Sequence, residues 1–258
     1  MLLSTFLPFL AAFSGALAAN APTTCRPASF IPDADDNTVP RRFGFLLYRA
    51  TDPLDFLGPS EVLFTLGRFA HVDLFYIAET LDLVSTELVP PATNPYNSTV
   101  WTTIAPTHTY DNPPPGLDVL VIPGGPGARA PTPATLDFVR KTYPNLDYFM
   151  TVCTGAMIAA RAGVLEGKNA TTNRAAWLAV KATGPNTNWI GDERWVVDGN
   201  IWTSSGVAAG IDAMVAFIAC FWGETLTNKT LLAMEYFRHP DPTNDPFAVW
   251  PNGTYKYI

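Results

Sequence analysis

The sequence predicts an α/β protein, a three-layer sandwich in which helices cover both faces of a mostly parallel central sheet. Apolar strand-like runs alternate along the chain with helix-like segments, which is the element order of such a sheet. Two of these runs, 119–122 and 148–152, are almost wholly apolar, as strands buried on both faces are. The first run leads to a glycine loop and the second to Cys153, on a strand-to-helix turn. Open α/β folds place their sites where such strand ends meet.

Length and charge narrow the classes of function. The chain has 258 residues, of which 48% are hydrophobic, and a net charge of −7. This length fits one large domain with an ample core. The acidic balance argues against a nucleic-acid partner, which would need a basic face. No group of histidines and cysteines has the spacing of a zinc site, so we expect no metal and no cofactor.

The N-terminus predicts export from the cell. Residues 1–18 are typical of a signal peptide, because an apolar stretch precedes the small-x-small cleavage site Ala16-Leu17-Ala18. The alternative, a membrane anchor, would be short for a span of about 20 apolar residues. Glycosylation sequons begin at Asn97, Asn169, Asn228 and Asn252. We therefore expect a secreted, extracellular glycoprotein that contacts no membrane after processing.

The three cysteines suggest different roles. In an oxidising compartment Cys25 and Cys220 could form a disulfide between the mature N-terminus and a late helix. Cys220 also lies in an apolar run, so a plain core cysteine is the alternative. Cys153 would then be left as a lone thiol, which in an exported protein needs an explanation.

The expected organisation has four parts. After the signal peptide, residues 19–41 are rich in Pro, Asp and Thr and suggest an extended N-terminal arm. Residues 42–240 hold the alternating strands and helices of the domain. Residues 241–258 form a proline-rich C-terminal tail.

Each element of the domain has a local sequence signal. Strands are expected where apolar runs lie between turn-forming residues: 43–48, 72–77, 119–122, 148–152, 170–172 and a hairpin over 194–203. The proline-containing segment 83–111 suggests short strands or another hairpin. Helices are expected over 58–66, 136–141, 154–163, 174–181, 205–222 and 226–238. Pro59 suits the first turn of its helix, and Asn173 suits the cap of the helix over 174–181.

Cys153 is the candidate nucleophile. The small residues Thr154, Gly155 and Ala156 suit a sharp strand-to-helix turn like the nucleophile turn of hydrolases. At such a turn the helix dipole and free N–H groups lower the pKa of a thiol. The alternative is a buried structural cysteine.

Two further features are expected at the same sheet edge. Gly124 and Gly125 let backbone N–H groups face a bound anion, although a plain turn is the alternative. Asp55 is expected in the loop after the first strand, where the alternative is a surface or helix-capping aspartate. None of the three histidines is next to Cys153 in the sequence, so a carboxylate or a hydroxyl is the expected proton-transfer partner.

The ordered motifs of the chain resemble the ThiJ/PfpI superfamily, which is class I glutamine-amidotransferase-like. The resemblance extends from about Arg42 to Phe247, nearly the whole mature chain. Its motifs are Pro-Gly-Gly-x-Gly at 123–127, Val-Cys-Thr-Gly-Ala at 152–156, the segment 165–172 and Thr-Ser-Ser-Gly-Val-Ala-Ala-Gly-Ile-Asp at 203–212. It implies a flavodoxin-like sandwich, usually a homodimer. Some transcriptional regulators share this domain, but they carry a DNA-binding helical domain in addition.

Within the superfamily, the segment 54–63 and the pair Cys153-Thr154 resemble the isonitrile hydratase branch. The resemblance places Asp55 beside the cysteine and implies an oxyanion site, which in this chain would use the amides of Gly125 and Thr154 beside Gly124. Threonine after the cysteine favours hydratase-like over peptidase chemistry. Hydratase-like members commonly have histidine where this chain has Asn173.

The leading hypothesis is therefore a cofactor-independent enzyme that adds water to an isonitrile through Cys153, Asp55 and Thr154. One alternative is a secreted hydrolase or glyoxalase-like enzyme that uses the same cysteine. Another is a non-catalytic protein that binds a small molecule or senses oxidants through an exposed, ionised thiol.

Overall fold

The structure, a computed structural model, describes residues 25–27, 29–33, 36, 38–89 and 93–256. The expected signal peptide over residues 1–18, and with it the first part of the expected arm, lies outside the described residues.

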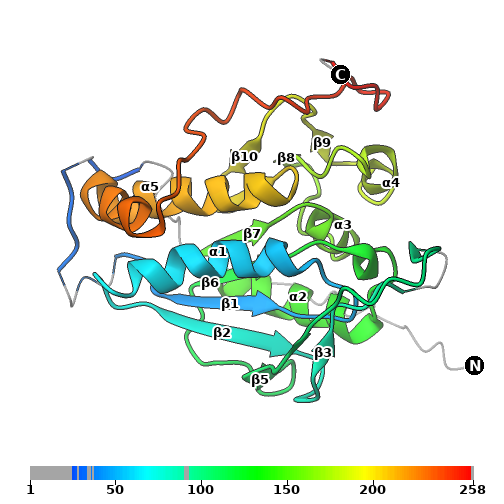
Figure 1. Cartoon of the computed structure of the whole chain (residues 1–258), viewed down its shortest axis with the longest axis horizontal. Helices are drawn as coiled ribbons and strands as arrows, with labels where there is room; N and C mark the ends of the chain where they lie inside the picture. Colours follow the sequence, from blue (N-terminus) through cyan, green and yellow to red (C-terminus); the bar gives the residue numbers. More distant parts are fainter. Residues whose placement is uncertain (1–24, 28, 34–35, 37, 90–92, 257–258) are drawn as a thin grey trace, which may run out of the picture.

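A seven-stranded sheet forms the centre of the protein (Figure 1). Its order is β10-β11-β7-β6-β1-β2-β5, and only β10 runs antiparallel to its neighbour. The strands are β1 (Arg42–Leu46), β2 (Asp73–Ala78), β5 (His108–Thr109), β6 (Val119–Ile122), β7 (Tyr148–Thr151), β10 (Trp195–Asp198) and β11 (Ile201–Ser204). The predicted fold class, with its mostly parallel sheet, is confirmed.

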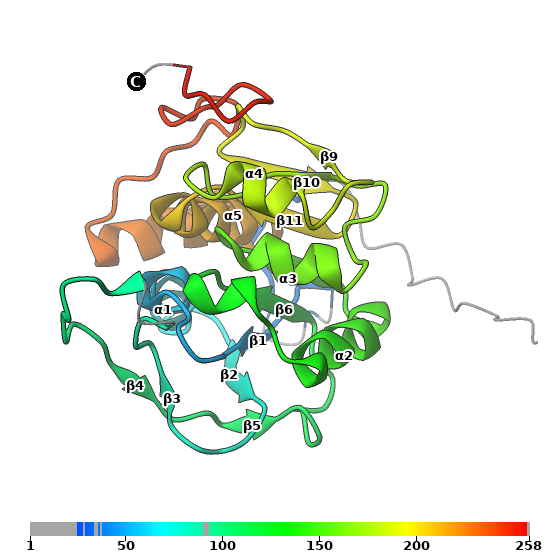
Figure 2. The same ribbon diagram turned by 90° about the vertical axis from the view of Figure 1, so that its right-hand side faces the viewer.

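Helices cover both faces of this sheet (Figure 2). The helices α1 (Pro53–Leu66) and α5 (Val207–Met234) lie on one face, and α2 (Pro133–Thr142) and α3 (Gly155–Arg161) lie on the other. Because side chains alternate along a strand, Val119 and Val121 of β6 enter the core under α1 and α5, while Leu120 and Ile122 enter the core under α2 and α3. Strands buried on both sides explain the almost wholly apolar runs.

Smaller elements surround the main layers. The expected hairpin within 83–111 is the pair β3 (Val84–Ser85) and β4 (Thr103–Ile104). β8 (Asn169–Ala170) pairs in parallel with β9 (Asn188–Trp189). The sequence pattern did not predict β9 or this pairing. Short helices complete the chain: η2 (Pro126–Arg129), η3 (Tyr143–Asn145) and α4 (Trp177–Lys181).

The first helix begins earlier than the sequence predicted. Asp52 caps it by accepting a hydrogen bond from the backbone N–H of Leu54, at 3.1 Å, and Pro53 occupies its first turn. Pro59 therefore lies inside the helix and not in its first turn. As a result Asp55, expected in a loop, is a residue of the first turn of α1, which gives its side chain a fixed direction.

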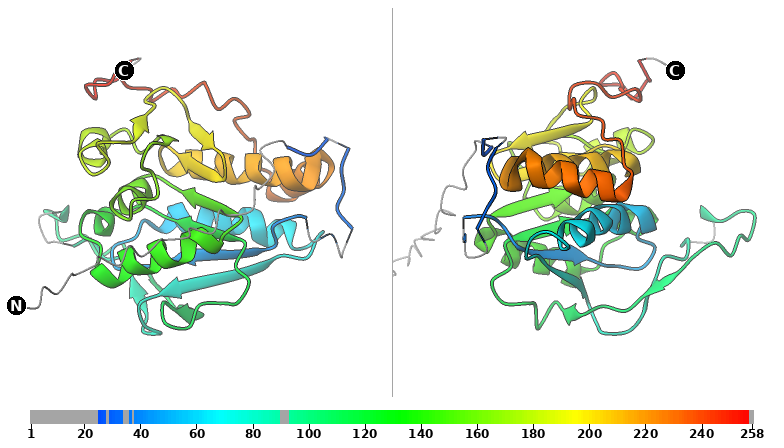
Figure 3. Two further views of the ribbon diagram at one scale, coloured as in Figure 1. Left: turned by 180° about the vertical axis from the view of Figure 1, so that it is seen from behind. Right: turned by 60° about the vertical axis from the view of Figure 1, so that its left-hand side comes forward.

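The two last predicted helices form one element, α5, interrupted at Gly223. This glycine has a φ of 78°, which breaks the helical path between the two halves. Among the described helices, α5 alone is long and apolar enough to cross a membrane. However, 67% of its most apolar stretch is buried inside the protein, beside α1 in Figure 3. Its apolar composition is explained by this burial in the core.

The C-terminal residues pack against the domain and do not form a separate tail beyond residue 240. Asp245, Ala248 and Val249 are each at most 2% exposed. An antiparallel bridge between Val249 and Tyr255 folds the last described residues back on themselves. The segment runs across the top of Figure 1, near the start of α5.

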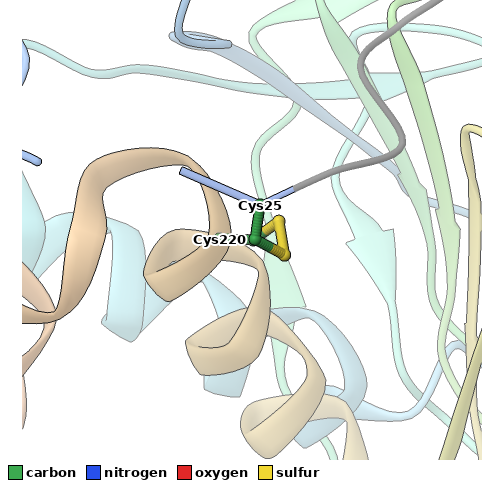
Figure 4. Close-up of a disulfide and its surroundings, with 2 residues drawn as sticks. All are labelled: Cys25 and Cys220. Atoms are coloured by element: carbon green, nitrogen blue, oxygen red, sulfur yellow. A yellow bond between two sulfur atoms is a disulfide. The ribbon is translucent and has the colours of Figure 1, made fainter. Parts of the chain in front are cut away.

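Cys25 and Cys220 are joined by a disulfide (Figure 4). The bond connects the first described residue of the arm to the middle of α5. The neighbouring backbone N–H of Arg26 donates a 2.8 Å hydrogen bond to the Cys220 carbonyl. Cys220 is also only 6% exposed and belongs to the hydrophobic core on the buried side of α5. It is therefore both a disulfide partner and a core residue.

Candidate active site

Cys153 lies on a tight turn between β7 and α3. Its φ is +56°, in the left-handed region that non-glycine residues rarely occupy. Gly155 makes the turn possible, because a Cβ at this position would lie 2.1 Å from the Ile122 carbonyl oxygen. The hydroxyl of Thr172 donates a 2.8 Å hydrogen bond to the Cys153 carbonyl and holds the turn from the side. Strained backbone of this kind is often found at functional sites.

Asp55 reaches the same place from the first turn of α1. Its side chain is fully buried, and its Oδ2 accepts a 2.8 Å hydrogen bond from the backbone N–H of Gly124. A Cβ at Gly124 would lie 2.7 Å from this oxygen and 2.6 Å from the backbone nitrogen of Thr154. Only glycine therefore allows the loop to pass between the acid and the start of α3.

The second glycine of the loop is held by Thr154. The Gly125 N–H donates to the Thr154 hydroxyl at 2.8 Å, and this hydroxyl donates to the Gly125 carbonyl at 3.2 Å. Both N–H groups of the glycine pair thus already have side-chain acceptors, Asp55 for Gly124 and Thr154 for Gly125. An oxyanion at these amides would have to compete with them, so the observed contribution of the pair is to position the acid and the threonine. The oxyanion role of the amides stays a prediction.

Burial is the largest influence on the pKa values of Asp55 and Cys153. It raises the pKa of Asp55 to about 7, assisted by the charge of Asp52 and opposed by the hydrogen bond from Gly124 and by the Cys153 thiol. The other carboxylate oxygen, Oδ1, is buried and accepts no hydrogen bond from the described residues. The Cys153 thiol and the Asp55 carboxyl group interact with each other, and this interaction shifts the pKa of both groups.

The expected low pKa of the thiol is wrong. Burial raises the pKa of Cys153 well above its ordinary value, and the charge of Asp55 raises it further. The backbone N–H of Thr154 acts in the opposite direction but is the weaker influence. Cys153 as a residue is only 6% exposed, so desolvation of the thiolate outweighs the helix terminus. Cys153 is therefore a neutral thiol that needs a base, and Asp55 is the group beside it that can act as one.

Three side chains that the sequence did not single out hold the site together. The Tyr48 hydroxyl donates to the Pro123 carbonyl at 2.6 Å, and Thr51 donates to the Gly124 carbonyl at 3.1 Å. Thr172 holds the cysteine turn as described above. Tyr48 and Thr51 lie between the end of β1 and Asp55. Their position shortly before a candidate acid was the sequence signal that could have identified them as site residues.

Asn173 closes a turn and does not cap the helix that was expected to follow it directly. Its Oδ1 accepts a 3.1 Å hydrogen bond from the backbone N–H of Ala176, and α4 begins only at Trp177. The amide nitrogen of Asn173 lies on the side of Gly206, 3.7 Å from where a Cβ of that glycine would stand. Asn173 thus borders the start of α5.

Within the described residues, no group of three or more His, Cys, Asp or Glu side chains is placed to hold a metal ion.

Comparison with known proteins gives consistent similarities. The model of the DJ-1/PfpI family matches residues 60–220. An isonitrile hydratase of Pseudomonas putida is 32% identical over 215 residues, covering 81% of this chain and 86% of that protein. A solved ThiJ/PfpI family protein from Pseudomonas syringae has a TM-score of 0.65 at 27% identity, covering 81% of this chain and 83% of that chain. Drosophila melanogaster DJ-1beta, with a TM-score of 0.60 and 17% identity over 76% of this chain and 98% of its own, shares the fold.

Proposed function

The chain belongs to the DJ-1/PfpI family, and from this premise we propose that it hydrates isonitriles to N-substituted formamides without a cofactor. The observation that carries the proposal is the buried pair of Cys153 and Asp55, a neutral thiol beside a carboxyl group that titrates near neutrality. The similarity to an isonitrile hydratase over most of both chains supports an enzyme of this family.

The first step forms a covalent intermediate. The Asp55 carboxylate takes the proton of the Cys153 thiol as the sulfur attacks the terminal carbon of R–N≡C. Asp55 then returns the same proton to that carbon. An S–C bond and a C–H bond form, the triple bond becomes C=N, and the intermediate is the thioimidate R–N=CH–S–Cys153.

The second step adds water. The Asp55 carboxylate removes a proton from water as the water oxygen attacks the thioimidate carbon, and Asp55 then passes this proton to the nitrogen. The S–C bond breaks as the hydroxyl group becomes a carbonyl, and the hydroxyl proton goes to the leaving sulfur, which releases R–NH–CHO and restores the thiol. The summed reaction is R–NC plus H₂O to R–NH–CHO, so no oxidant, reductant or cofactor is needed.

The test is the rate of formamide formation from an alkyl isonitrile. Cys153→Ala is expected to abolish the reaction. The double variant Cys25→Ser/Cys220→Ser, which removes the other two cysteines, is expected to retain it. A Cys153→Ala protein that hydrates isonitriles as fast as the parent would overturn the mechanism.

The raised pKa and the burial of Cys153 favour this enzyme over an oxidant-sensing protein. A sensor thiol is ionised and exposed, whereas the Cys153 thiol is protonated and the residue is only 6% exposed. Among the described residues, no contact at the site points specifically to a peptide or a dicarbonyl substrate.

We also propose that the enzyme is exported and glycosylated. The side chains of Asn97 and Asn252 are exposed in loop and turn segments, and that of Asn228 is exposed on α5. Asn169 is exposed too, but its amide donates to Asp198 at 3.0 Å. Treatment of protein secreted by a eukaryotic host with an N-glycosidase is expected to lower its mass. An unchanged mass would contradict the proposal.

A further inference from the structure

A series of buried hydrogen bonds connects the nucleophile turn to the C-terminal segment. The Thr172 hydroxyl donates to the Cys153 carbonyl at 2.8 Å, and the Thr172 carbonyl accepts from Nη1 of Arg174 at 3.3 Å. Nε and Nη2 of the same guanidinium donate to Oδ2 of Asp245 at 3.2 and 2.9 Å. We call Thr172, Arg174 and Asp245 the Arg174 network. Its residues are at most 5% exposed, so little water can compete for these hydrogen bonds.

Arg174 makes its contacts within the protein and offers no net charge to an anionic ligand. Besides the contacts above, Nη1 donates to the Thr171 hydroxyl at 2.7 Å and Nη2 donates to the Glu193 carbonyl. The Asp245 carboxylate, 2.9 Å away, balances the charge of the guanidinium. Arg174 thus joins three segments that are distant in the sequence: the loop after β8, the loop after β9 and the C-terminal segment.

The nucleophile turn needs support from its surroundings. Cys153 has a φ of +56°, which a non-glycine residue keeps only where neighbouring groups hold it. On one side, Gly155 packs so closely against the backbone of Ile122 that no Cβ fits between them. On the other side, the Thr172 hydroxyl holds the Cys153 carbonyl. The Arg174 network is therefore attached to the residue of the turn that has the unusual backbone conformation.

The hydrogen bond from Thr172 orients the peptide group between Cys153 and Thr154. A trans peptide group is planar, so its C=O and N–H point in opposite directions. The N–H of this peptide group belongs to Thr154, and its hydrogen bond to the Cys153 sulfur favours the ionised thiol. Because Thr172 fixes the carbonyl on one side, it also fixes the N–H that faces the sulfur on the other.

We propose that Arg174 and Asp245 are positioning residues for the nucleophile. Through Thr172 they hold the peptide group between Cys153 and Thr154 in the orientation that keeps the Thr154 N–H on the sulfur as the thiol loses its proton. The C-terminal segment thereby acts on the site from a distance, through the loop after β8. For isonitrile hydration this inference rests on the proposed function, but the reactivity of the thiol can be measured without it.

The titratable groups that influence the thiol lie outside the network. Burial, the largest influence, raises the pKa of Cys153, and Asp55 and Asp52 at the start of α1 raise it further. Burial and Asp55 also raise the pKa of Tyr48, which follows β1, and the charge of Cys153 adds to this effect. Substitutions in the network leave these groups in place, so a change in the ionisation of Cys153 reports on the Thr154 N–H.

The test uses substitutions that separate the hydroxyl and the guanidinium from general stability. Thr172→Val removes the hydroxyl and keeps the shape of the side chain, whereas Thr172→Ser keeps the hydroxyl and removes the methyl group. Arg174→Lys keeps a positive charge for Asp245 but loses the planar guanidinium that bridges it to the Thr172 carbonyl. Leu146→Ala is the matched control, because it destabilises the core beside α2, where Leu146 is 3% exposed, at the end of β7 away from Cys153.

The first measurement is the rate at which iodoacetamide alkylates Cys153, followed by intact mass over a range of pH. Of the three cysteines, all within the part of the chain that the structure describes, Cys153 alone is free, so a single adduct reports on it. Thr172→Val is expected to slow alkylation at pH 8 about tenfold and to move the midpoint of the profile to higher pH, because the thiolate loses a donor. Arg174→Lys should act in the same direction, and Thr172→Ser should restore the rate to within about threefold.

A loss of stability alone acts in the opposite direction. It opens the fold more often and exposes the buried thiol, so Leu146→Ala is expected to be alkylated as fast as the parent or faster. If Thr172→Val and Arg174→Lys are also alkylated as fast as the parent or faster, the network only stabilises the fold and the inference is wrong.

The second measurement is the hydration of an alkyl isonitrile under conditions in which all the proteins are folded. Thr172→Val is expected to lower kcat about tenfold or more and to leave KM within about threefold, because the thiol is misplaced and the substrate contacts are not. If the parent hydrates no isonitrile, the proposed function is wrong, while the alkylation rates still decide the positioning role. If Thr172→Val and Thr172→Ser lower kcat equally, the hydroxyl does not position the nucleophile and the inference is wrong.

Discussion

At the scale of single residues, the site depends on how deeply two ionisable groups are buried. The residue types alone suggested a thiolate activated by a helix terminus. In the folded protein, desolvation acts on both Cys153 and Asp55 and favours their neutral forms. The acid is the group that titrates near neutral pH, and it therefore controls when the thiol can react.

The rate should accordingly follow the ionisation of Asp55. Burial raises the pKa of Asp55 to about 7, so below that pH the group is protonated and cannot accept the thiol proton. We expect kcat/KM for an isonitrile to rise with pH and to level off above about pH 7. Asp55→Asn should remove this rise and lower the plateau by about 10²–10⁴-fold, the usual contribution of a general acid–base group. A profile that Asp55→Asn leaves unchanged would assign the titration to another group.

The same burial should destabilise the fold at higher pH. The pKa of Asp55 is raised in the folded protein, so the stability it allows is complete below the pKa of about 4 in the unfolded chain and is lost as the pH rises through about 7. The loss is at most about 4 kcal/mol at pH 8. We expect Asp55→Asn, whose amide oxygen can still accept from Gly124, to be more stable than the parent at pH 8 and similar to it at pH 4. Urea unfolding at the two pH values measures this; an equal difference at both would contradict it.

At the scale of elements, three chain segments meet to make the site. The N-terminal turn of α1 brings Asp55, the glycine loop after β6 fixes its oxygen, and the turn before α3 carries Cys153. The positions of the loop and of the cysteine follow from the apolar runs that precede them. The start of α1 did not, because Asp52-Pro53 is a helix-start signal that was outweighed by Gly58-Pro59 in the sequence.

The C-terminal segment is held to these elements by buried ion pairs. Asp245 contacts Arg174 at 2.9 Å and Arg194 at 3.8 Å, and its side chain is fully buried. Asp245→Asn would leave two buried guanidinium groups with one carboxylate, so we expect a loss of about 3–5 kcal/mol in the free energy of unfolding. Asp192→Asn is the matched control. It breaks the Lys256–Asp192 pair, whose aspartate is 55% exposed, and should cost at most about 1 kcal/mol. If urea unfolding gives the same loss of stability for Asp245→Asn and Asp192→Asn, the buried ion pairs stabilise the fold no more than the exposed one.

At the scale of the whole molecule, the sheet separates two cores and the disulfide closes the chain over one of them. Cys25 and Cys220 are 195 residues apart in the sequence, so the bond constrains the unfolded chain strongly. Cys220 lies 13 residues beyond the start of α5, which is about 20 Å along the helix from its N-terminal end. The bond should therefore matter for stability and little for catalysis.

Removing the disulfide tests this separation. Cys25→Ser is expected to lower the free energy of unfolding by about 2–5 kcal/mol, because the unfolded chain gains freedom. Its kcat/KM should stay within about twofold of the parent at a temperature where both are folded. The parent treated with a thiol reductant is the control and should lose the same stability. No loss in either protein would show that the bond does not constrain the fold.

The sequence by itself determined the fold class, the two buried strands, the glycine loop and the candidate residues Cys153 and Asp55. Those features depend on local patterns, because alternating apolar runs, glycines and turn residues act through their neighbours in the chain. Only the tertiary structure decided that Asp55 is in a helical turn, that burial keeps Cys153 protonated, and that the C-terminal segment packs against the domain. These properties arise where segments distant in the sequence exclude water from one another, and no local pattern encodes how much water is excluded.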